Sequence, residues 1–327
     1  MHDNVKVLDV HGHVSTPPEF FAHGTLLMAS NSQFRPLHIA DERMEEAQQR
    51  HLRELDDRGV DVQLVGPRPF AMFMHVRPHV QTAWCRATND TIAQACRLHP
   101  DRFLGMAQLP QNATLDTSNC VAEFERCVKE LGFAGAYLNP DPDGRKNAPG
   151  VNDPYWYPLY EKACELDKPL MVHPAGTFDP RVECLNANYQ INNVTEEYIA
   201  TQLFSRTDVF ERYPTLRVVV CHCGGSLDRW IKTDPHMGQK DLSRNLFYDT
   251  CAHDEAFLTA AIMQRGVDQM LFGTEVPGSG GALRPGSGRP ADDLVPVVAG
   301  LEILSSQDKA KIFNGNAKRV FSDLTRF

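Results

Sequence analysis

Short apolar runs bounded by polar or turn-forming residues recur along the whole chain. They are rich in Val, Leu and Phe, and several begin or end beside Pro, Gly or Asp. Such runs are typical of parallel strands that are buried on both faces of a sheet. The expected strands are Lys6–Val10, Val60–Val65, Phe103–Gln108, Phe133–Asn139, Pro169–Val172, Leu216–Cys221, Asn245–Tyr248 and Gln269–Phe272.

Between these runs lie segments whose apolar residues recur every three or four positions, which predicts amphipathic helices. The expected helices are Asp41–Arg58, Val80–Leu98, Thr117–Leu131, Tyr155–Leu166, Thr195–Glu211 and Asp254–Arg265. An open doubly wound sheet would alternate strands and helices in the same way, but eight strands is the number that a (β/α)8 TIM-type barrel requires. We therefore predict an α/β fold, with residues 1–327 forming a single barrel domain.

Three segments that follow strands are longer than ordinary connections between a strand and a helix. They are Val14–Ala40, Pro140–Asn152 and Pro277–Pro290. Long loops inside a compact domain are usually lids or binding loops, so we expect these segments to border a functional site. The Gly- and Ser-rich Pro277–Pro290 is expected to be mobile or to wrap a substrate.

Five of the apolar runs end in residues that bind metals or move protons. They lead into His11-Gly12-His13, His173, His222, Asp249-Thr250 and Glu275. The C-terminal ends of barrel strands share one face, and TIM barrels carry their active sites there. The recurrence therefore predicts that these side chains converge.

His11 and His13 flank a glycine, and residues two apart on a strand project to the same side. We expect Gly12 to let the backbone turn past an ion that both imidazoles bind. A His-x-His pair alone is more often a solvated or core pair, but His173 and Glu275 at later strand ends favour a metal site. Imidazole with carboxylate suits Zn²⁺ first, with Mn²⁺ and Fe²⁺ as alternatives.

His222 follows the most strand-like run of the chain. It is interpreted as a fourth ligand, a general acid or base, or a group that polarises a carbonyl, with a core histidine as the alternative. Strand alternation would aim Cys221 and Cys223 away from it, so we assign both thiols to packing.

Composition narrows the class of partner. A net charge of −9 and a pI near 5.8 argue against nucleic acid, so a small substrate is expected. The negative charge does not exclude an anionic substrate, because local Arg and His can reverse the field inside a cleft. Nine scattered cysteines suggest reduced thiols of an intracellular protein. No run approaches the ~20 apolar residues that cross a bilayer. We expect a cytoplasmic homo-oligomer with no membrane partner.

The strand-end motifs together carry a family resemblance. The strings Leu8–His13, Met171–Pro174, Cys221–Gly225 and Leu271–Glu275 resemble the amidohydrolase superfamily, and within it the group that contains aminocarboxymuconate-semialdehyde decarboxylase. The resemblance spans nearly the whole chain. It implies a distorted (β/α)8 barrel with one divalent metal.

One residue departs from the decarboxylases of this group, which carry Asp where this chain has Glu275. Together with Gly66-Pro67-Arg68, Asn139–Pro142 and Trp156-Tyr157-Pro158, Glu275 makes the chain similar to the group's hydratases, which act on 4-oxalomesaconate. That resemblance implies Zn²⁺ on His11, His13, His173 and Glu275, and a lyase of aromatic catabolism that hydrates a C=C bond. Nonoxidative decarboxylation and metal-dependent hydrolysis on the same barrel are the enzymatic alternatives, and a metal-dependent binding protein is the non-enzymatic one.

Hydration of a conjugated keto-acid needs a base for water and a donor to carbon, roles that Glu275 and His222 fit. Four residues just past strand ends are candidates to hold the substrate carboxylates, although each alone is equally well explained as a solvated surface residue. They are Arg68, His75, Asn139 and Arg181.

Overall fold

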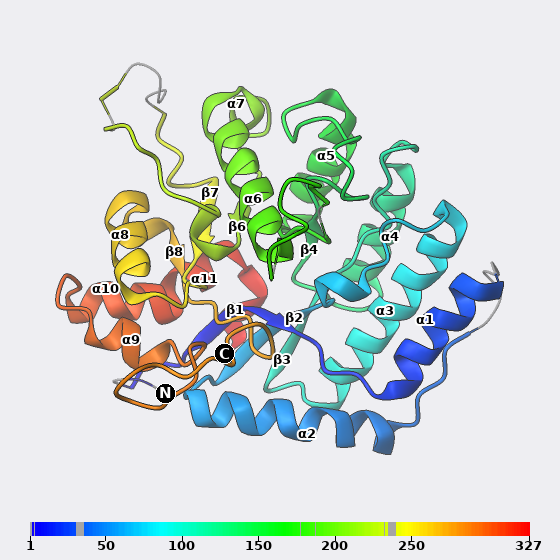
Figure 1. Ribbon diagram of the computed structural model, residues 1–327, viewed down its shortest axis with the longest axis horizontal. Coiled ribbons are helices and arrows are strands. Elements are labelled where there is room, and N and C mark those ends of the chain that lie inside the picture. The colour runs from blue at the N-terminus through cyan, green and yellow to red at the C-terminus, as the bar shows by residue number, and fades with distance from the viewer. Residues whose placement is uncertain are drawn as a thin grey trace.

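Eight parallel strands in sequential order form the centre of the molecule (Figure 1). The computed structural model describes residues 2, 4–30, 36–176, 178–186, 188–231, 233–234 and 240–327. The strands are β1 (Leu8–His13), β2 (Val62–Gly66), β3 (Phe103–Ala107), β4 (Gly135–Leu138), β5 (Leu170–Val172), β6 (Val218–Val220), β7 (Leu246–Asp249) and β8 (Met270–Leu271). Each falls on a predicted run, so the predicted barrel is confirmed.

Backbone hydrogen bonds return the last strand to the first. The amide of Val10 donates to the carbonyl of Phe272 at 2.9 Å, and the amide of Glu275 donates to the carbonyl of His11 at 2.7 Å. The sheet is thereby nearly closed, and closure places the residues that follow β8 beside the end of β1.

The helices surround this sheet (Figure 1). They are α1 (Pro18–Ser30), α2 (Asp41–Arg58), α3 (Pro78–Leu98), α4 (Ser118–Lys129), α5 (Tyr157–Leu166), α6 (Asn188–Arg206), α7 (Val209–Arg212), α8 (Glu255–Arg265), α9 (Val295–Gly300), α10 (Ser306–Ala310) and α11 (Asn316–Val320). All six predicted helices are present. The one predicted over Thr195–Glu211 begins earlier, at Asn188, and is divided into α6 and α7.

The segment Val14–Ala40 differs from the long loop that the sequence predicts, because its middle forms α1. Pro18 starts the helix at a position where proline fits, and Phe20 packs on Trp84 of α3 with ring centroids 4.4 Å apart. Residues 31–35 of that segment lie outside the described residues. Among the residues that are described, every helix is too short or too polar to span a bilayer.

Two apolar cores lie on the two sides of the sheet. One fills the space between strands and helices, and the other fills the barrel interior. The interior core contains Leu8, Leu64, Met171 and Phe247 from the strands, and Phe321 just after α11. Because side chains fill the barrel interior, we expect the site at the C-terminal ends of the strands, where the long loops lie.

Candidate active site

Three histidines and one carboxylate from three strand ends meet inside the barrel mouth. His11 and His13 lie on β1, His173 follows β5 and Glu275 follows β8. Each offers a ligand atom, and these four atoms lie within 4.8 Å of one another. The Nε2 atoms of His11 and His173 and both ring nitrogens of His13 are buried without a hydrogen-bond partner among the described residues. Buried polar atoms normally have a partner, so this set fits a divalent metal.

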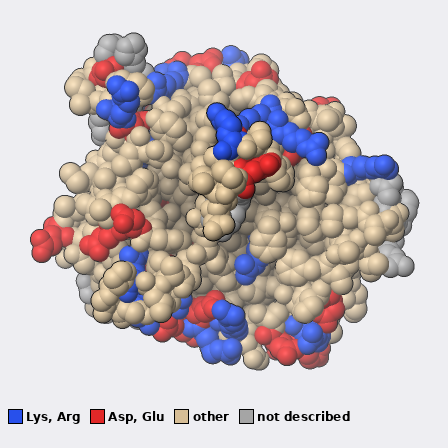
Figure 2. All heavy atoms as spheres, in the orientation of Figure 1, with Lys and Arg blue, Asp and Glu red and all other residues tan. Residues whose placement is uncertain are grey.

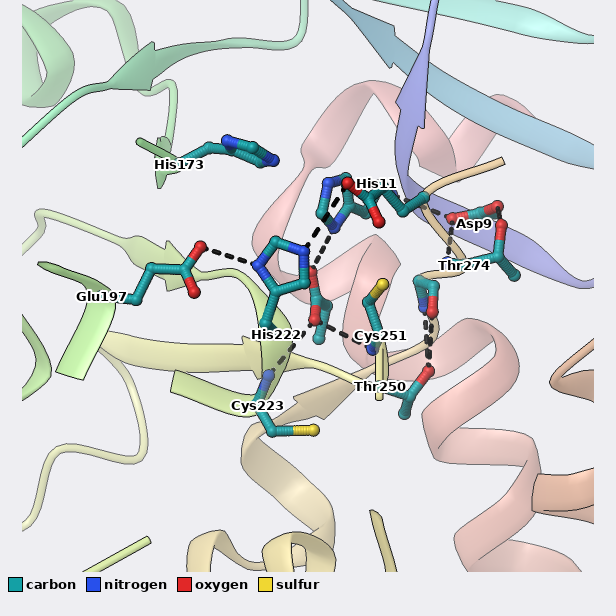
Figure 3. Close-up of polar contacts among 12 residues, drawn as sticks. Asp9, His11, His173, Glu197, His222, Cys223, Thr250, Cys251 and Thr274 are labelled. Carbon is teal, nitrogen blue, oxygen red and sulfur yellow. Dashed lines mark hydrogen bonds and ion pairs between the residues drawn. The ribbon is translucent and has the colours of Figure 1, made fainter. Parts of the chain in front are cut away.

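Hydrogen bonds at the far side of two rings fix how those rings face the cluster. The His11 Nδ1–H donates to Asp249 Oδ2 at 2.7 Å (Figure 3). The His173 Nδ1–H donates to the carbonyl of Pro174 at 2.8 Å. In both rings Nε2 is then the unprotonated nitrogen that points inward. Such outer partners are typical of metal-binding histidines. Asp249, predicted to converge with the histidines, therefore orients His11 by accepting a hydrogen bond from its Nδ1–H.

Burial keeps the clustered imidazoles neutral. It lowers the pKa of His13 to about 4, and it lowers the pKa of His173 well below its ordinary value, with help from the neighbouring His11. At neutral pH both rings therefore offer a lone pair instead of a proton. A metal ion competes with protons for these atoms, so low pKa values favour its binding near pH 7.

Gly12 has a different role from the one that the sequence suggests. It lies within β1, and the strand continues through His13 instead of turning. A Cβ at Gly12 would stand 2.1 Å from the side-chain carbon Cδ of Gln63. Gln63 donates from that place to Asp9 Oδ2 at 2.8 Å, and Asp9 also accepts from the Thr274 hydroxyl. The glycine thus makes room for a polar network that joins β1, β2 and the end of β8.

His222 stands beside the cluster and is held by a buried glutamate. Its Nδ1–H donates to Glu197 Oε1 of α6 at 2.8 Å (Figure 3). Burial lowers the pKa of His222, but the charge of Glu197 and hydrogen bonds from neighbouring groups outweigh burial and raise it well above the ordinary value. His222 is therefore the ring of this site that keeps a proton.

The backbone is left-handed at His222, Cys223 and Glu275, with φ of 50°, 59° and 65°. Non-glycine residues rarely adopt this conformation, and where they do it is often at a functional site. The turn also breaks the alternation that the sequence predicts after β6. Cys221 belongs to the interior core and Cys223 to the outer core, so the two thiols do not point the same way, although both are buried in packing as expected.

The two carboxylate oxygens of Glu275 have different neighbours. Oε1 lies 3.6 Å from His13 Nε2 and 3.8 Å from His222 Nε2. Oε2 accepts a hydrogen bond from the Ser279 hydroxyl at 2.8 Å. Burial raises the pKa of Glu275, but its contacts with His13 and His222 outweigh burial and hold the pKa well below its usual range. The group is thus an ionised carboxylate that faces both the neutral His13 and the proton-bearing imidazole of His222.

A cavity of about 660 Å³ opens above His13 and Glu275. The face seen in Figure 2 is hollowed near its middle, with acidic and basic residues interspersed around it. Two of the three long segments that follow strands reach its wall, through Asp143 and Ser279, whereas no described residue of Val14–Ala40 lines it. The other lining residues are Arg68, Pro69, Phe70, Phe73, Met74, His75, Pro142, Ala175, Gly176, Phe178, Asp179, Glu183, Asn192, Asn193 and Gly278.

Two of the four predicted substrate-binding residues line this cavity. Arg68 is largely buried and forms no hydrogen bond or ion pair with another described residue. Burial lowers the pKa of Arg68, yet a guanidinium stays charged at neutral pH. His75 is exposed at the same wall. The cavity therefore presents a charged donor group that is available to an anion.

The other two predicted residues are not brought into the cavity. Arg181 is 81% exposed, and its guanidinium pairs with Asp179 beside a neighbouring hollow of about 300 Å³. Asn139 is buried under the site, where it accepts from the Gln111 side chain and donates to the carbonyl of His173 at 2.5 Å. Arg181 thus neutralises the carboxylate of Asp179, which lines the cavity wall. Asn139 holds the backbone of His173 in place.

Tyr137 of β4 supports His173 from below. The two rings are stacked with centroids 5.6 Å apart and an interplanar angle of 3°. This placement depends on Gly66 at the end of β2, because a Cβ there would lie 2.6 Å from Tyr137 Cζ. The glycine thus makes space for the ring that stacks on His173.

Gly66→Ala should lower the free energy of unfolding by about 1–3 kcal/mol, the usual penalty for overpacking a core. Urea denaturation measures this change. Gly300→Ala is the matched control, because a Cβ at Gly300 meets no atom within 4 Å. Equal stabilities of the two variants would contradict the assigned role of Gly66.

Sequence reasoning missed three residues of the site, which are Glu197, Tyr137 and Cys251. Glu197 lies inside a helix, and its contact with His222 links residues 25 positions apart. Tyr137 alternates inward on a strand that was correctly predicted, so the period of β4 could have found it. Cys251 follows Asp249 at the end of β7, and that position was the available signal.

A sequence model described as amidohydrolase matches residues 8–322. The chain belongs to the amidohydrolase family. A 2-keto-4-carboxy-3-hexenedioate hydratase from Sphingobium sp. is 33% identical to it over 98% of this chain and 97% of the relative. A gamma-resorcylate decarboxylase from Polaromonas sp. is 29% identical, over 72% and 78% of the two chains. A hydratase and a decarboxylase are thus both among the relatives of this amidohydrolase.

Solved structures agree with this placement. The 4-oxalomesaconate hydratase of Rhodopseudomonas palustris superposes with a TM-score of 0.86 at 28% identity, covering 98% of this chain and 97% of that one. A dihydroxybenzoic acid decarboxylase from Polaromonas sp., solved with bound manganese, shares the fold with a TM-score of 0.68 at 22% identity, over 99% and 100% of the chains. That likeness shows the shared fold, and the manganese is a property of the decarboxylase.

Proposed function

We propose that this amidohydrolase is a metal-dependent lyase that adds water to the C=C bond of a small unsaturated keto-polycarboxylate, resembling 4-oxalomesaconate, in the breakdown of aromatic compounds. The observation that carries the proposal is the position of Glu275 Oε1 between His13 and His222. Likeness to two hydratases over nearly the full chain supports it.

His11, His13, His173 and Glu275 would hold one divalent metal, for which Zn²⁺ is the first choice and Mn²⁺ the alternative. When bound, the metal acts as a Lewis acid that polarises water or a carbonyl oxygen. The nitrogen-rich set with a single carboxylate favours Zn²⁺ over the hard cations Mg²⁺ and Ca²⁺, which prefer oxygen ligands.

Glu275 and His222 can divide the two proton transfers of a hydration. Glu275 is ionised and accepts a proton from the attacking water at Oε1. The new C–O bond forms as the π electrons of the double bond move toward the carbonyl. The bond to Glu197 stabilises the protonated ring of His222, and its Nε2, on the side of Glu275, delivers a proton to the neighbouring carbon. The sum is one water added and no group lost.

Arg68→Gln should raise KM for the keto-polycarboxylate by about tenfold to a hundredfold, with a smaller change in kcat, because a charged hydrogen bond contributes about 1.5–3 kcal/mol. Steady-state kinetics with the wild type and the variant would measure it. Arg181→Gln is the matched control and should leave KM nearly unchanged, since Arg181 pairs with Asp179 away from the cavity. Equal effects in both variants would contradict the assignment of Arg68.

The proposed reaction itself is tested by mass spectrometry in H₂¹⁸O. An unsaturated keto-tricarboxylate should gain the mass of one labelled water, with neither CO₂ nor ammonia released. Loss of CO₂ would instead support nonoxidative decarboxylation, which the Polaromonas relative makes the second candidate. Glu275→Asp sharpens the test: we expect this shorter carboxylate to lose most hydration, and a variant that keeps full activity while releasing CO₂ would favour the decarboxylase.

Hydrolysis on the same barrel is the further alternative, and it would appear in the same experiment as cleavage into two products. A cytoplasmic location, a homo-oligomeric state and the absence of nucleic-acid and membrane partners stay predictions from the sequence.

A further inference from the structure

Cys251 stands at a junction of donor atoms that the proposed mechanism does not use. It follows β7 and is 2% exposed. Its sulfur shares one group of mutually close donors with His253 and Glu275, and another with His11 and His222, with all atoms of each group within 4.8 Å of one another. In Figure 3 the Cys251 side chain points toward the rings of His11 and His222.

One nitrogen near this sulfur is available as a ligand. The Nε2 atom of His253 is buried and has no hydrogen-bond partner among the described residues. His222 lies beside this group, with its Nε2 3.8 Å from Glu275 Oε1, but it keeps a proton and is a neighbour instead of a ligand. A thiol, an imidazole and a carboxylate therefore face one another beside the first cluster.

The other buried thiol of the site does not offer such a set. Cys221 is grouped with His11 and Asp249, but these two residues are hydrogen-bonded to each other at 2.7 Å. Their facing atoms are therefore occupied. The His11, His222 and Cys251 group likewise draws on His11, which belongs to the proposed metal centre. Among the residues that the structure describes, only the group of Cys251, His253 and Glu275 adds a new histidine.

We propose that Cys251, His253 and Glu275 form a second cation site for a soft divalent ion such as Zn²⁺ or Cd²⁺. Thiolate with imidazole selects soft and borderline metals over Mg²⁺ and Ca²⁺. The Cys251 thiol releases its proton to solvent when the ion binds. Glu275 would be common to both sites.

Occupation of this second site opposes turnover. An ion on Glu275 occupies the carboxylate that accepts the proton of the attacking water in the proposed reaction. Excess Zn²⁺ therefore inhibits an enzyme that needs one equivalent. This effect on turnover rests on the proposed function, whereas binding of the ion does not.

Titration of the protein carrying one equivalent of Zn²⁺ with Cd²⁺ tests the binding. A sulfur-to-metal charge-transfer band should grow in the ultraviolet and saturate near one added equivalent. Cys251→Ser should abolish the band, and His253→Asn should raise the Kd for Cd²⁺ about tenfold or more, while elemental analysis still finds the first Zn²⁺ in both. Cys184→Ser is the matched control: Cys184 is exposed, so its loss should leave the band intact.

Three outcomes would overturn the proposal. They are a band that persists in Cys251→Ser, a Kd unchanged in His253→Asn, and total metal that stays at one equivalent because Cd²⁺ only replaces Zn²⁺. Failure of the proposed function is separate. If Cd²⁺ binds as expected but no keto-polycarboxylate is hydrated, the second site stands and the hydratase assignment falls.

Discussion

His11→Ala and His173→Ala should each lose the metal, with affinity lowered roughly a hundredfold or more and turnover lost in parallel. Changes behind a metal ligand already weaken binding about 10–100-fold, so removal of a ligand should exceed that range. The buried Nε2 atoms of His11 and His173 are the structural reason, because no other group satisfies them among the described residues. Elemental analysis after dialysis gives metal per chain.

The exposed His38 provides the control, and His38→Ala should keep the wild-type metal content. Asp249→Asn should have a metal affinity between those of the wild type and His11→Ala. It removes the carboxylate that accepts from His11 Nδ1, so it should weaken metal binding less than His11→Ala does. Full metal retention in both ligand variants would refute the site.

His222→Asn should lower kcat by a factor on the order of 10² or more, which is the usual contribution of a general acid or base. Asparagine cannot carry the proton that His222 holds beside Glu197. Single-turnover kinetics would show the loss in the chemical step. Circular dichroism and metal content should match the wild type.

Glu197→Gln tests the role of His222 by changing its hydrogen-bond partner. It leaves the imidazole in place but removes the charge that raises the pKa of His222, so kcat should fall less than in His222→Asn. A near-normal rate in His222→Asn, or loss of its fold, would show that His222 serves packing instead of proton transfer.

The fold was predictable because its signals are local. Each strand is an apolar run buried on both faces, and α2 begins and ends at the predicted residues, closed by Gly59 in a left-handed cap. The three short helices α9 to α11 were missed. They span five or six residues each, and periodicity needs a longer window to be read.

The candidate site was predictable in part, because parallel strands bring their C-terminal ends together. That rule brought His11, His13, His173 and Glu275 into one group. Arg181 was misplaced because no strand sets the course of its loop, and Asn139 was misread because its partners lie on other strands. Glu197 had no signal, since only tertiary packing brings α6 beside His222.

The return of β8 to β1 also has a consequence for biosynthesis. Asp9 and Thr274, which are hydrogen-bonded in the closed barrel, are separated by 265 positions. At about 5–20 residues per second, the ribosome adds the second of them roughly 13–50 s after the first. Until then His11 and His13 have no Glu275 beside them. The proposed metal centre can therefore be completed only after Glu275 has been added, long after the chain has exposed its first histidines.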